Sequence, residues 1–180
     1  MLDTQQIFEG LPLTIGAAHL EAVALPDVTL VAPYKGQMMA VADVLKAEIG
    51  MTLPPAGQCG ESAKAMAYWR APGQWLVFGA LNAGKLAGMA AVADMSDAFG
   101  RLRLTGSADV LARLVELDTE EMQQGAVAHT VLADIPTTLI VVENGVEIVV
   151  PRSYAGSTVA RLKLAIRGVA ARERLNAGHG

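Results

Sequence analysis

The sequence predicts an α+β fold with one or more antiparallel sheets and helices packed on one face. Hairpin signals join many of the predicted strands. Asn144-Gly145 is the strongest of them, because a type I′ turn needs a positive φ at both central residues. Residues 101–104 alternate polar and apolar side chains, as a half-buried strand does. Two other segments, 37–49 and the one that follows Ser153, repeat apolar residues at helical spacing.

The stretch 91–118 is the part around which the rest of the chain is organised. It reads as strand, turn, strand, turn and helix, with Gly100 and Gly106 in the turns. Ser107 stands where a helix N-cap is expected, and Asp109 places a negative charge in the first turn. The predicted buried face of this helix consists of Val110, Leu111, Leu114 and Val115.

The segment before this stretch contains four strands and the first clear helix. Pro26 in Leu25-Pro26-Asp27 fixes φ for a turn, and Gly50 ends the helix. The predicted elements are strands at 19–24, 28–31, 63–70 and 74–78, a helix at 37–49 and a loop at 53–60. The helix buries Met38, Ala42, Leu45 and Ile49. Residues 82–88 fit either a short helix or a loop.

After an acidic turn at 119–124, the chain predicts three more strands and a final helix. The strands are 128–134, 136–142 and 146–150. Ser153 caps the last helix, and its apolar stripe is Ala155, Val159, Leu162, Ile166 and Val169. By length we expect an N-terminal arm over 1–18, a single α+β domain over 19–175 and a disordered tail over 176–180.

The composition is unusually apolar. Hydrophobic residues make up 52% and charged residues 18% of the 180 residues. Either part of the surface is buried against a partner, or alanine and glycine raise the count without forming a patch. The net charge of -4 and the lack of a basic stripe argue against nucleic acid. A single cysteine, Cys59, and an N-terminus without a signal-peptide pattern favour the cytoplasm.

Several patterns could carry chemistry, and for each of them we favour a plainer interpretation. Residues 79–85 match G-x-x-x-x-G-K of phosphate-binding loops, but Leu86 cannot ligate Mg²⁺, which favours a Gly/Ala-rich connection. Cys59 and His129 are a weak nucleophile–base pair, because no local signature surrounds either. The histidines 19, 129 and 179 are too dispersed to predict a metal site.

Asp94 and Ser96 form D-M-S, which reads either as an acid–nucleophile pair or as side chains that shape a turn by bonding to the backbone. The turn interpretation is favoured because Asp and Ser commonly bond locally in this way. No catalytic, cofactor-binding or metal-binding residue is therefore predicted.

Candidates for a partner interface are Trp69, Arg70, Trp75 and Arg152. The two tryptophans bracket one turn in a chain that is only 4% aromatic, and tryptophan and arginine are enriched in interfaces. A role in the core is slightly favoured for the two tryptophans. Arg152 fits either a bond to a partner's carboxylate or a place at the start of the final helix.

The order of several short motifs resembles a known family. They are Leu53-Pro54-Pro55, the hairpin 68–76, Asp94-Met95-Ser96, Leu104-Thr105-Gly106-Ser107-Ala108, Leu117-Asp118, the run 125–133 and Arg152-Ser153-Tyr154-Ala155. Together they resemble the gamma subunit of heterotetrameric sarcosine oxidase over about 19–166. That family is in turn similar to the folate-binding domain of the glycine cleavage T protein.

The resemblance implies a non-catalytic structural subunit with no cofactor of its own. In such assemblies the alpha and beta subunits bind FAD, FMN, NAD and tetrahydrofolate, and a delta subunit holds zinc. The complex oxidises sarcosine to glycine, and gamma packs against the folate-side domain of alpha. An alternative is a free-standing folate-binding or one-carbon transfer protein related to aminomethyltransferase, with homodimerisation completing its pocket.

Overall fold

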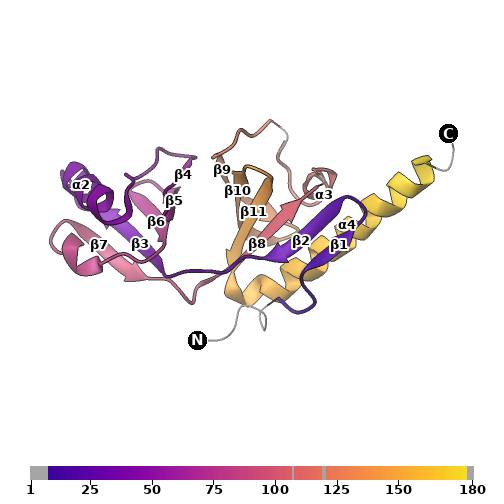
Figure 1. Ribbon diagram of the computed structural model, residues 1–180, viewed down its shortest axis with the longest axis horizontal. Coiled ribbons are helices and arrows are strands. Elements are labelled where there is room, and N and C mark those ends of the chain that lie inside the picture. The colour runs from indigo at the N-terminus through magenta and orange to yellow at the C-terminus, as the bar shows by residue number, and fades with distance from the viewer. Residues whose placement is uncertain (1–7, 107, 119–120, 178–180) are drawn as a thin grey trace. The chain divides into compact units, whose positions relative to one another are not determined.

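The structure is a computed structural model that describes residues 8–106, 108–118 and 121–177. The chain forms two compact units (Figure 1). Unit 1 comprises Met1–Ala24, Phe99–Gln124 and Ala128–Gly180, and unit 2 comprises Leu25–Ala98 and Gly125–Val127. The residues predicted as a single domain over 19–175 thus belong to two units with separate hydrophobic cores.

Unit 1 is built on a six-stranded sheet with the order β1-β2-β8-β11-β10-β9. The strands are β1 (Leu13–Ile15), β2 (Ala18–Ala22), β8 (Phe99–Thr105), β9 (Val127–Leu132), β10 (Ile135–Val142) and β11 (Gly145–Pro151). Neighbours β1 and β2, β2 and β8, β8 and β11, and β11 and β10 all pair antiparallel. Strand β8 alternates strictly between buried and half-buried residues, as its sequence predicts.

The helices of unit 1 are α3 (Asp109–Ala112), the 3-10 turn η2 (Arg152–Tyr154) and the long helix α4 (Ala155–Ala177). Helix α4 packs against the sheet and α3 (Figure 1). All five residues of its predicted stripe are buried, with Leu162 and Ile166 fully inaccessible. They join Leu102 and Leu104 of β8 in the core of unit 1.

Unit 2 is a five-stranded sheet with one helix, α2 (Met38–Ile49), and a short 3-10 turn, η1 (Ala83–Leu86). The sheet order is β4-β5-β6-β3-β7, and neighbouring strands pair antiparallel throughout. Its strands are β3 (Val28–Pro33), β4 (Cys59–Glu61), β5 (Met66–Ala71), β6 (Gln74–Phe78) and β7 (Ala90–Asp94). The predicted α+β class with antiparallel sheets is therefore confirmed.

The predicted helix 37–49 is confirmed, but its buried face is displaced. Val41, Leu45 and Ile49 are buried and pack in the core of unit 2, whereas Met38 is 43% exposed. Val41 and Ala42 both lie close enough to Leu45 and Ile49 on the helix surface to belong to the same apolar stripe. In the structure the larger side chain, Val41, is the one that is buried. Gly50 ends the helix in the left-handed region, as predicted, with φ 76.

The hairpin predicted at Asn144-Gly145 forms, but not by the predicted turn. Gly145 pairs with Val142 and belongs to β11, with φ 149. Glycine is required at position 145 because the backbone of β8 lies close to it: a Cβ there would be 2.2 Å from the carbonyl oxygen of Leu104. Positive φ at two successive residues occurs instead at Ala133 and Asp134, which connect β9 to β10.

Three other predictions are modified by the structure. The arm predicted over 1–18 contains β1, and the loop predicted over 53–60 ends in β4, which begins at Cys59. The segment 82–88 is mostly the 3-10 turn η1, and the predicted tail starts within α4. Ser107, with its N-cap, and residues 1–7, 119–120 and 178–180 lie outside the described residues.

Strands that follow each other in sequence are divided between the two sheets. Strand β2 lies in unit 1 and β3 in unit 2, and β7 lies in unit 2 and β8 in unit 1. At the boundary, the backbone N–H of Val23 donates to the carbonyl oxygen of Arg101 at 2.9 Å. Residues 25–98 are therefore an insertion whose two flanks are neighbours in unit 1.

Candidate functional site

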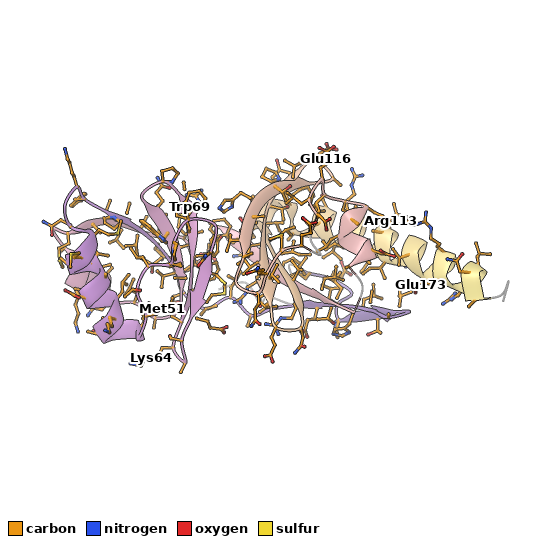
Figure 2. The ribbon with its side chains drawn as sticks, turned by 90° about the horizontal axis from the view of Figure 1, so that it is seen from above. Met51, Lys64, Trp69, Arg113, Glu116 and Glu173 are labelled. Carbon is orange, nitrogen blue, oxygen red and sulfur yellow. The ribbon has the colours of Figure 1, made fainter. Side chains whose placement is uncertain are left out.

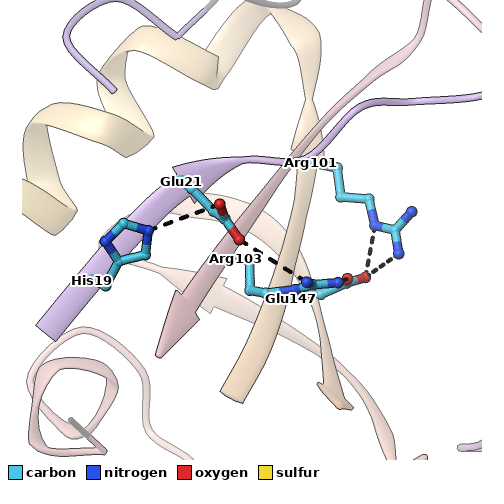
Figure 3. Close-up of polar contacts among 5 residues, drawn as sticks. All are labelled: His19, Glu21, Arg101, Arg103 and Glu147. Carbon is cyan, nitrogen blue, oxygen red and sulfur yellow. Dashed lines mark hydrogen bonds and ion pairs between the residues drawn. The ribbon is translucent and has the colours of Figure 1, made fainter. Parts of the chain in front are cut away.

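A group of charged side chains in mutual contact lies on the six-stranded sheet of unit 1 (Figure 3). Glu147 of β11 stands opposite Arg103 of β8, and its side chain is completely buried. Arg101 Nε donates to Glu147 Oε2 at 2.6 Å, and Arg103 Nη2 donates to Glu147 Oε1 at 2.6 Å. Arg101 Nη2 also contacts Oε2. One carboxylate thus joins two arginines of the adjacent strand.

The neighbours of this group continue across β2. Arg103 Nη1 lies 4.0 Å from Glu21 Oε1, and His19 Nε2 lies 3.8 Å from Glu21 Oε2. These outer contacts are long and exposed, so they contribute little to stability. Leu102 and Leu104 face the core. Because side chains alternate along a strand, Arg101 and Arg103 lie on the opposite face of the sheet.

The two arginines satisfy the carboxylate of Glu147, whereas Nε of Arg103 is buried and has no hydrogen-bond partner among the described residues. Both oxygens of Glu147 accept charge-assisted hydrogen bonds, which are the stronger kind. Its lone pairs are therefore directed at Arg101 and Arg103. The arrangement is suited to fixing the register of β8 against β11, because a slip of one residue would leave a buried carboxylate without a partner.

A cavity of about 440 Å³ lies in unit 2, next to the end of α2. Its lining combines an apolar wall with two exposed charges, Lys46 and Glu61. The wall is formed by Met51, Leu53, Pro54 and Pro55, with Cys59 beside it. Figure 2 labels Met51, whose methyl group lies 2.9 Å from the position that a Cβ on Gly60 would take. The volume is that of a small-molecule pocket, but the site is open to solvent, and polar and apolar atoms line it about equally.

Trp75 anchors one wall of this cavity. Its side chain is 7% exposed, and Nε1 donates to the carbonyl oxygen of Pro54 at 2.8 Å. Ser62 similarly fixes the end of α2, because its hydroxyl donates to the carbonyl oxygen of Ile49 at 2.6 Å. The loop between α2 and β4 is thus tied to the sheet by polar bonds to its backbone.

We expect Trp75→Phe to lower the free energy of unfolding by about 1–2 kcal/mol, because the buried carbonyl of Pro54 loses its donor. Chemical denaturation of the wild type and the variant measures this difference. A loss below about 0.5 kcal/mol would show that water replaces the indole N–H at no cost.

The loop 79–85 does not have the structure of a phosphate-binding loop. It leads into η1, which has only four residues, and Asn82 Oδ1 accepts from the backbone N–H of Gly84 at 3.1 Å. The lysine of the motif, Lys85, is paired with Glu48 of α2 at 2.5 Å. The plainer interpretation, a connection between elements, is confirmed.

The remaining candidates lie in different strands. Cys59 lies in β4 of unit 2, and His129 lies in β9 of unit 1, where its Nδ1 is 3.0 Å from Thr138 Oγ1. His19 Nδ1 is 2.7 Å from Thr14 Oγ1. His179 lies outside the described residues. Across the part of the chain that the structure describes, no three His, Cys, Asp or Glu side chains gather as metal ligands would.

Asp94 and Ser96 shape the turn after β7, as the structural interpretation predicts. Asp94 Oδ1 accepts from the backbone N–H of Ser96 at 2.9 Å and from its hydroxyl at 2.6 Å. Ser96 Oγ in turn accepts from the backbone N–H of Val28 at 3.0 Å, at the start of β3. The hydrogen bond from the Ser96 hydroxyl, followed by the one from its N–H, lowers the pKa of Asp94 below its ordinary value of 3.8.

We expect Ser96→Ala to raise the pKa of Asp94 toward its ordinary value, because the carboxylate loses its main donor. With a lowered folded-state pKa, the bonds stabilise the fold at pH above the ordinary value, and this contribution is lost as the pH falls through the lowered pKa. NMR titration of the Asp94 carboxyl carbon measures the shift. Ser96→Thr, which keeps the hydroxyl, is the control, and an equal pKa in both variants would contradict the assignment.

The four interface candidates differ in exposure. Trp75 lies in the interior of unit 2, opposite Trp69, which is half-buried. Arg70 is exposed, with Nη1 3.5 Å from Gln74 Oε1. Arg152 is half-buried in η2 of unit 1. Their role at an interface stays a prediction.

Sequence reasoning missed Glu147 and its arginines as a group. They are separated by 44 and 46 residues, so no local spacing joins them. The available signal was a carboxylate inside an otherwise apolar strand, since a buried charge requires a partner. The alternating arginines of β8 were the obvious source of that partner.

No protein-family model matches the sequence, and no curated protein matches it significantly. A chain of the heterotetrameric sarcosine oxidase from Corynebacterium sp. U-96, solved with pyrrole 2-carboxylate, matches with a TM-score of 0.72 and 24% identity. The match covers 85% of this chain and 85% of that chain. The aminomethyltransferase T of the glycine cleavage system from Bartonella henselae matches with a TM-score of 0.58 and 18% identity.

The second match covers 83% of this chain but 46% of the transferase, so the present chain spans about half of that protein. At these identities the similarity concerns the fold. The resemblance inferred from the motif order is confirmed at that level. The chain has the fold found both in a chain of heterotetrameric sarcosine oxidase and in aminomethyltransferase T.

Proposed function

We propose that the chain is a non-catalytic structural subunit, of the gamma type, in a heterotetrameric sarcosine oxidase of the cytoplasm. The observation that carries this proposal is a structural match to a chain of such an enzyme, which covers 85% of this chain and 85% of that chain. A match that covers most of both chains supports a role like that of the matched chain. The transferase, in contrast, is matched over less than half its length.

The side-chain chemistry of the described residues supports the same role. Glu147 is bonded to Arg101 and Arg103, and Lys85 is paired with Glu48. Titratable groups held in this way stabilise strands and helices, whereas catalysis requires groups that converge on a substrate. The proposal therefore assigns oxidation of sarcosine to glycine to the partner subunits.

In this proposal alpha is the main partner, with beta and delta in the same complex. FAD, FMN, NAD, tetrahydrofolate and zinc are bound by those subunits, and this chain holds no cofactor. Arg70 and Trp69 of unit 2 and Arg152 of unit 1 are candidates for contacts with alpha. Trp75 would act indirectly, by supporting the hairpin that presents its neighbours.

The test is purification of the tagged chain from its source cells. The expected result is co-purification of larger subunits with flavin absorbance and sarcosine-dependent formation of hydrogen peroxide. The isolated chain should show neither property. Turnover of sarcosine by the isolated chain, or its purification without any flavin-containing subunit, would overturn the proposal.

A second candidate is a free-standing folate-binding or one-carbon transfer protein, and the cavity of unit 2 is the observation that favours it. The similarity of the chain's fold to that of aminomethyltransferase T supports the same candidate. Titration with tetrahydrofolate should then raise the melting temperature, since a ligand at about 100 times its Kd stabilises the folded state by about 2.7 kcal/mol. Lys46→Ala, an exposed change in the cavity lining, should reduce that rise. No shift in the wild type would exclude this candidate.

A further inference from the structure

Helix α4 has a charge opposite to that of the chain. It carries five basic residues and one acidic residue, Glu173, whereas the whole chain has a net charge of -4. The basic residues are Arg161, Lys163, Arg167, Arg172 and Arg174. The four arginines are exposed, and none forms an ion pair with a described residue. The solvent face of α4 is thus a concentrated positive surface.

An apolar stripe runs along the middle of this face. Leu164 and Leu175 are 69% and 64% exposed. With Gly168 and Ala171 they follow a spacing of four, three and four residues, which keeps them on one side of a helix. At 100° per residue, Arg161 and Arg172 lie on one side of the stripe and Arg167 and Arg174 on the other.

The helix α3 adds another arginine to the same face. A Cβ on Gly168 would lie 3.0 Å from Nη1 of Arg113, so this guanidinium lies over the glycine. Arg113 follows α3 directly and is labelled in Figure 2. The resulting face, which we call the α4 docking face, consists of Leu164, Gly168, Ala171, Leu175 and the five arginines around them. Arginine around a small apolar centre is typical of protein interfaces.

We propose that the α4 docking face binds an acidic protein surface that has an apolar centre. Charge complementarity carries this proposal, since unpaired arginines on a free surface repel each other and are relieved by carboxylates across an interface. A bilayer is a poorer occupant. A helix that lies in a membrane inserts its wide apolar face into the lipid. The wide apolar face of α4, which includes Leu162 and Ile166, is already buried in the core of unit 1.

The identity of the partner rests on the proposed function: the acidic surface belongs to the large subunit of the oxidase. Binding of that purified subunit to this chain is measured by biolayer interferometry at about 50 mM and about 300 mM salt. The variants are Arg161→Glu/Arg172→Glu, which reverses charge, and Leu164→Gln, which keeps helix propensity and removes the apolar contact. The control is Lys35→Glu/Lys64→Glu, an equal charge change on exposed residues of unit 2.

We expect the arginine reversal to slow association about 10-fold at low salt and less at high salt, because steering is screened. Leu164→Gln should speed dissociation about 10-fold. The control should bind like the wild type, and all variants should keep the wild-type melting temperature within a few degrees. These results together support the proposal.

Three outcomes would overturn it. If the wild type binds the subunit and the α4 variants bind equally well, the docking face lies elsewhere and the proposed function stands. If the wild type does not bind the subunit, the proposed function fails together with this partner. If the arginine reversal instead abolishes self-association in sedimentation, or binding to phosphatidylserine vesicles, the occupant is a second copy or a membrane.

Discussion

Glu147→Gln is expected to lower the free energy of unfolding by about 3 kcal/mol, because breaking a buried ion pair from one side leaves charge without compensation. Arg101, whose side chain is only 12% exposed, then keeps its positive charge in a site with little water. Arg103 is 38% exposed and can be hydrated more easily. The main cost therefore comes from Arg101.

Urea denaturation of the variant and the wild type measures this loss. Glu21→Gln is the matched control, since Glu21 is 40% exposed and its contact with Arg103 is 4.0 Å long. It should change the stability by less than about 0.5 kcal/mol. Equal effects of the two substitutions would show that the buried carboxylate contributes no more than an exposed one.

Gly106→Ala is the second change with a large expected effect, a loss of about 2–5 kcal/mol in the free energy of unfolding. Gly106 has φ 85, where a non-glycine residue costs about 1–2 kcal/mol. In addition, a Cβ at this position would lie 1.8 Å from the carbonyl oxygen of Ala17, so the end of the β2–β8 ladder must move apart. Overpacking of that kind adds about 1–3 kcal/mol.

Gly36→Ala separates the two contributions. Gly36 has φ 80, but nothing lies within 4 Å of a Cβ built on it. It should therefore lose only the conformational part, about 1–2 kcal/mol. Thermal or urea denaturation of the two variants gives the difference, and equal losses would contradict the predicted contact with Ala17.

Local chemistry in the sequence predicted the individual elements of the fold. The stripe on α4 is a regular repeat of large apolar residues, and all of its predicted members are buried. The hairpin of β5 and β6 follows from a Pro-Gly turn between two apolar runs, and Gly50 ends α2 as predicted. These features depend on residues that are close in sequence.

The assignment of strands to sheets did not follow from the sequence. Alternation determines which side chains of a strand face inward, but it does not determine the neighbouring strand. Strands β2 and β3 flank a short turn signal and nevertheless lie in different units. Gly145 shows the same limitation, because its role depends on the approach of Leu104, a residue of another strand.

The candidate site was predictable only in part. The bonding role of Asp94 and Ser96 could be inferred, since both partners lie within two residues. The Glu147 cluster requires β8 and β11 to be adjacent, which is known only once the sheet order is known. The α4 docking face combines helical spacing with knowledge of which face the core covers.

The hydrogen bond between Val23 and Arg101 has a consequence for engineering. Residues 25–98 leave the host sheet and return to it at adjacent backbone positions, so a link of two to five residues suffices to close the gap. Residues 25–98 can therefore be treated as a replaceable segment. Its length and content can be exchanged between Ala24 and Phe99 while the ladder of the flanking strands is retained, provided that Gly125–Val127, which bond to Gly57 and Cys59 in unit 2, receive new partners.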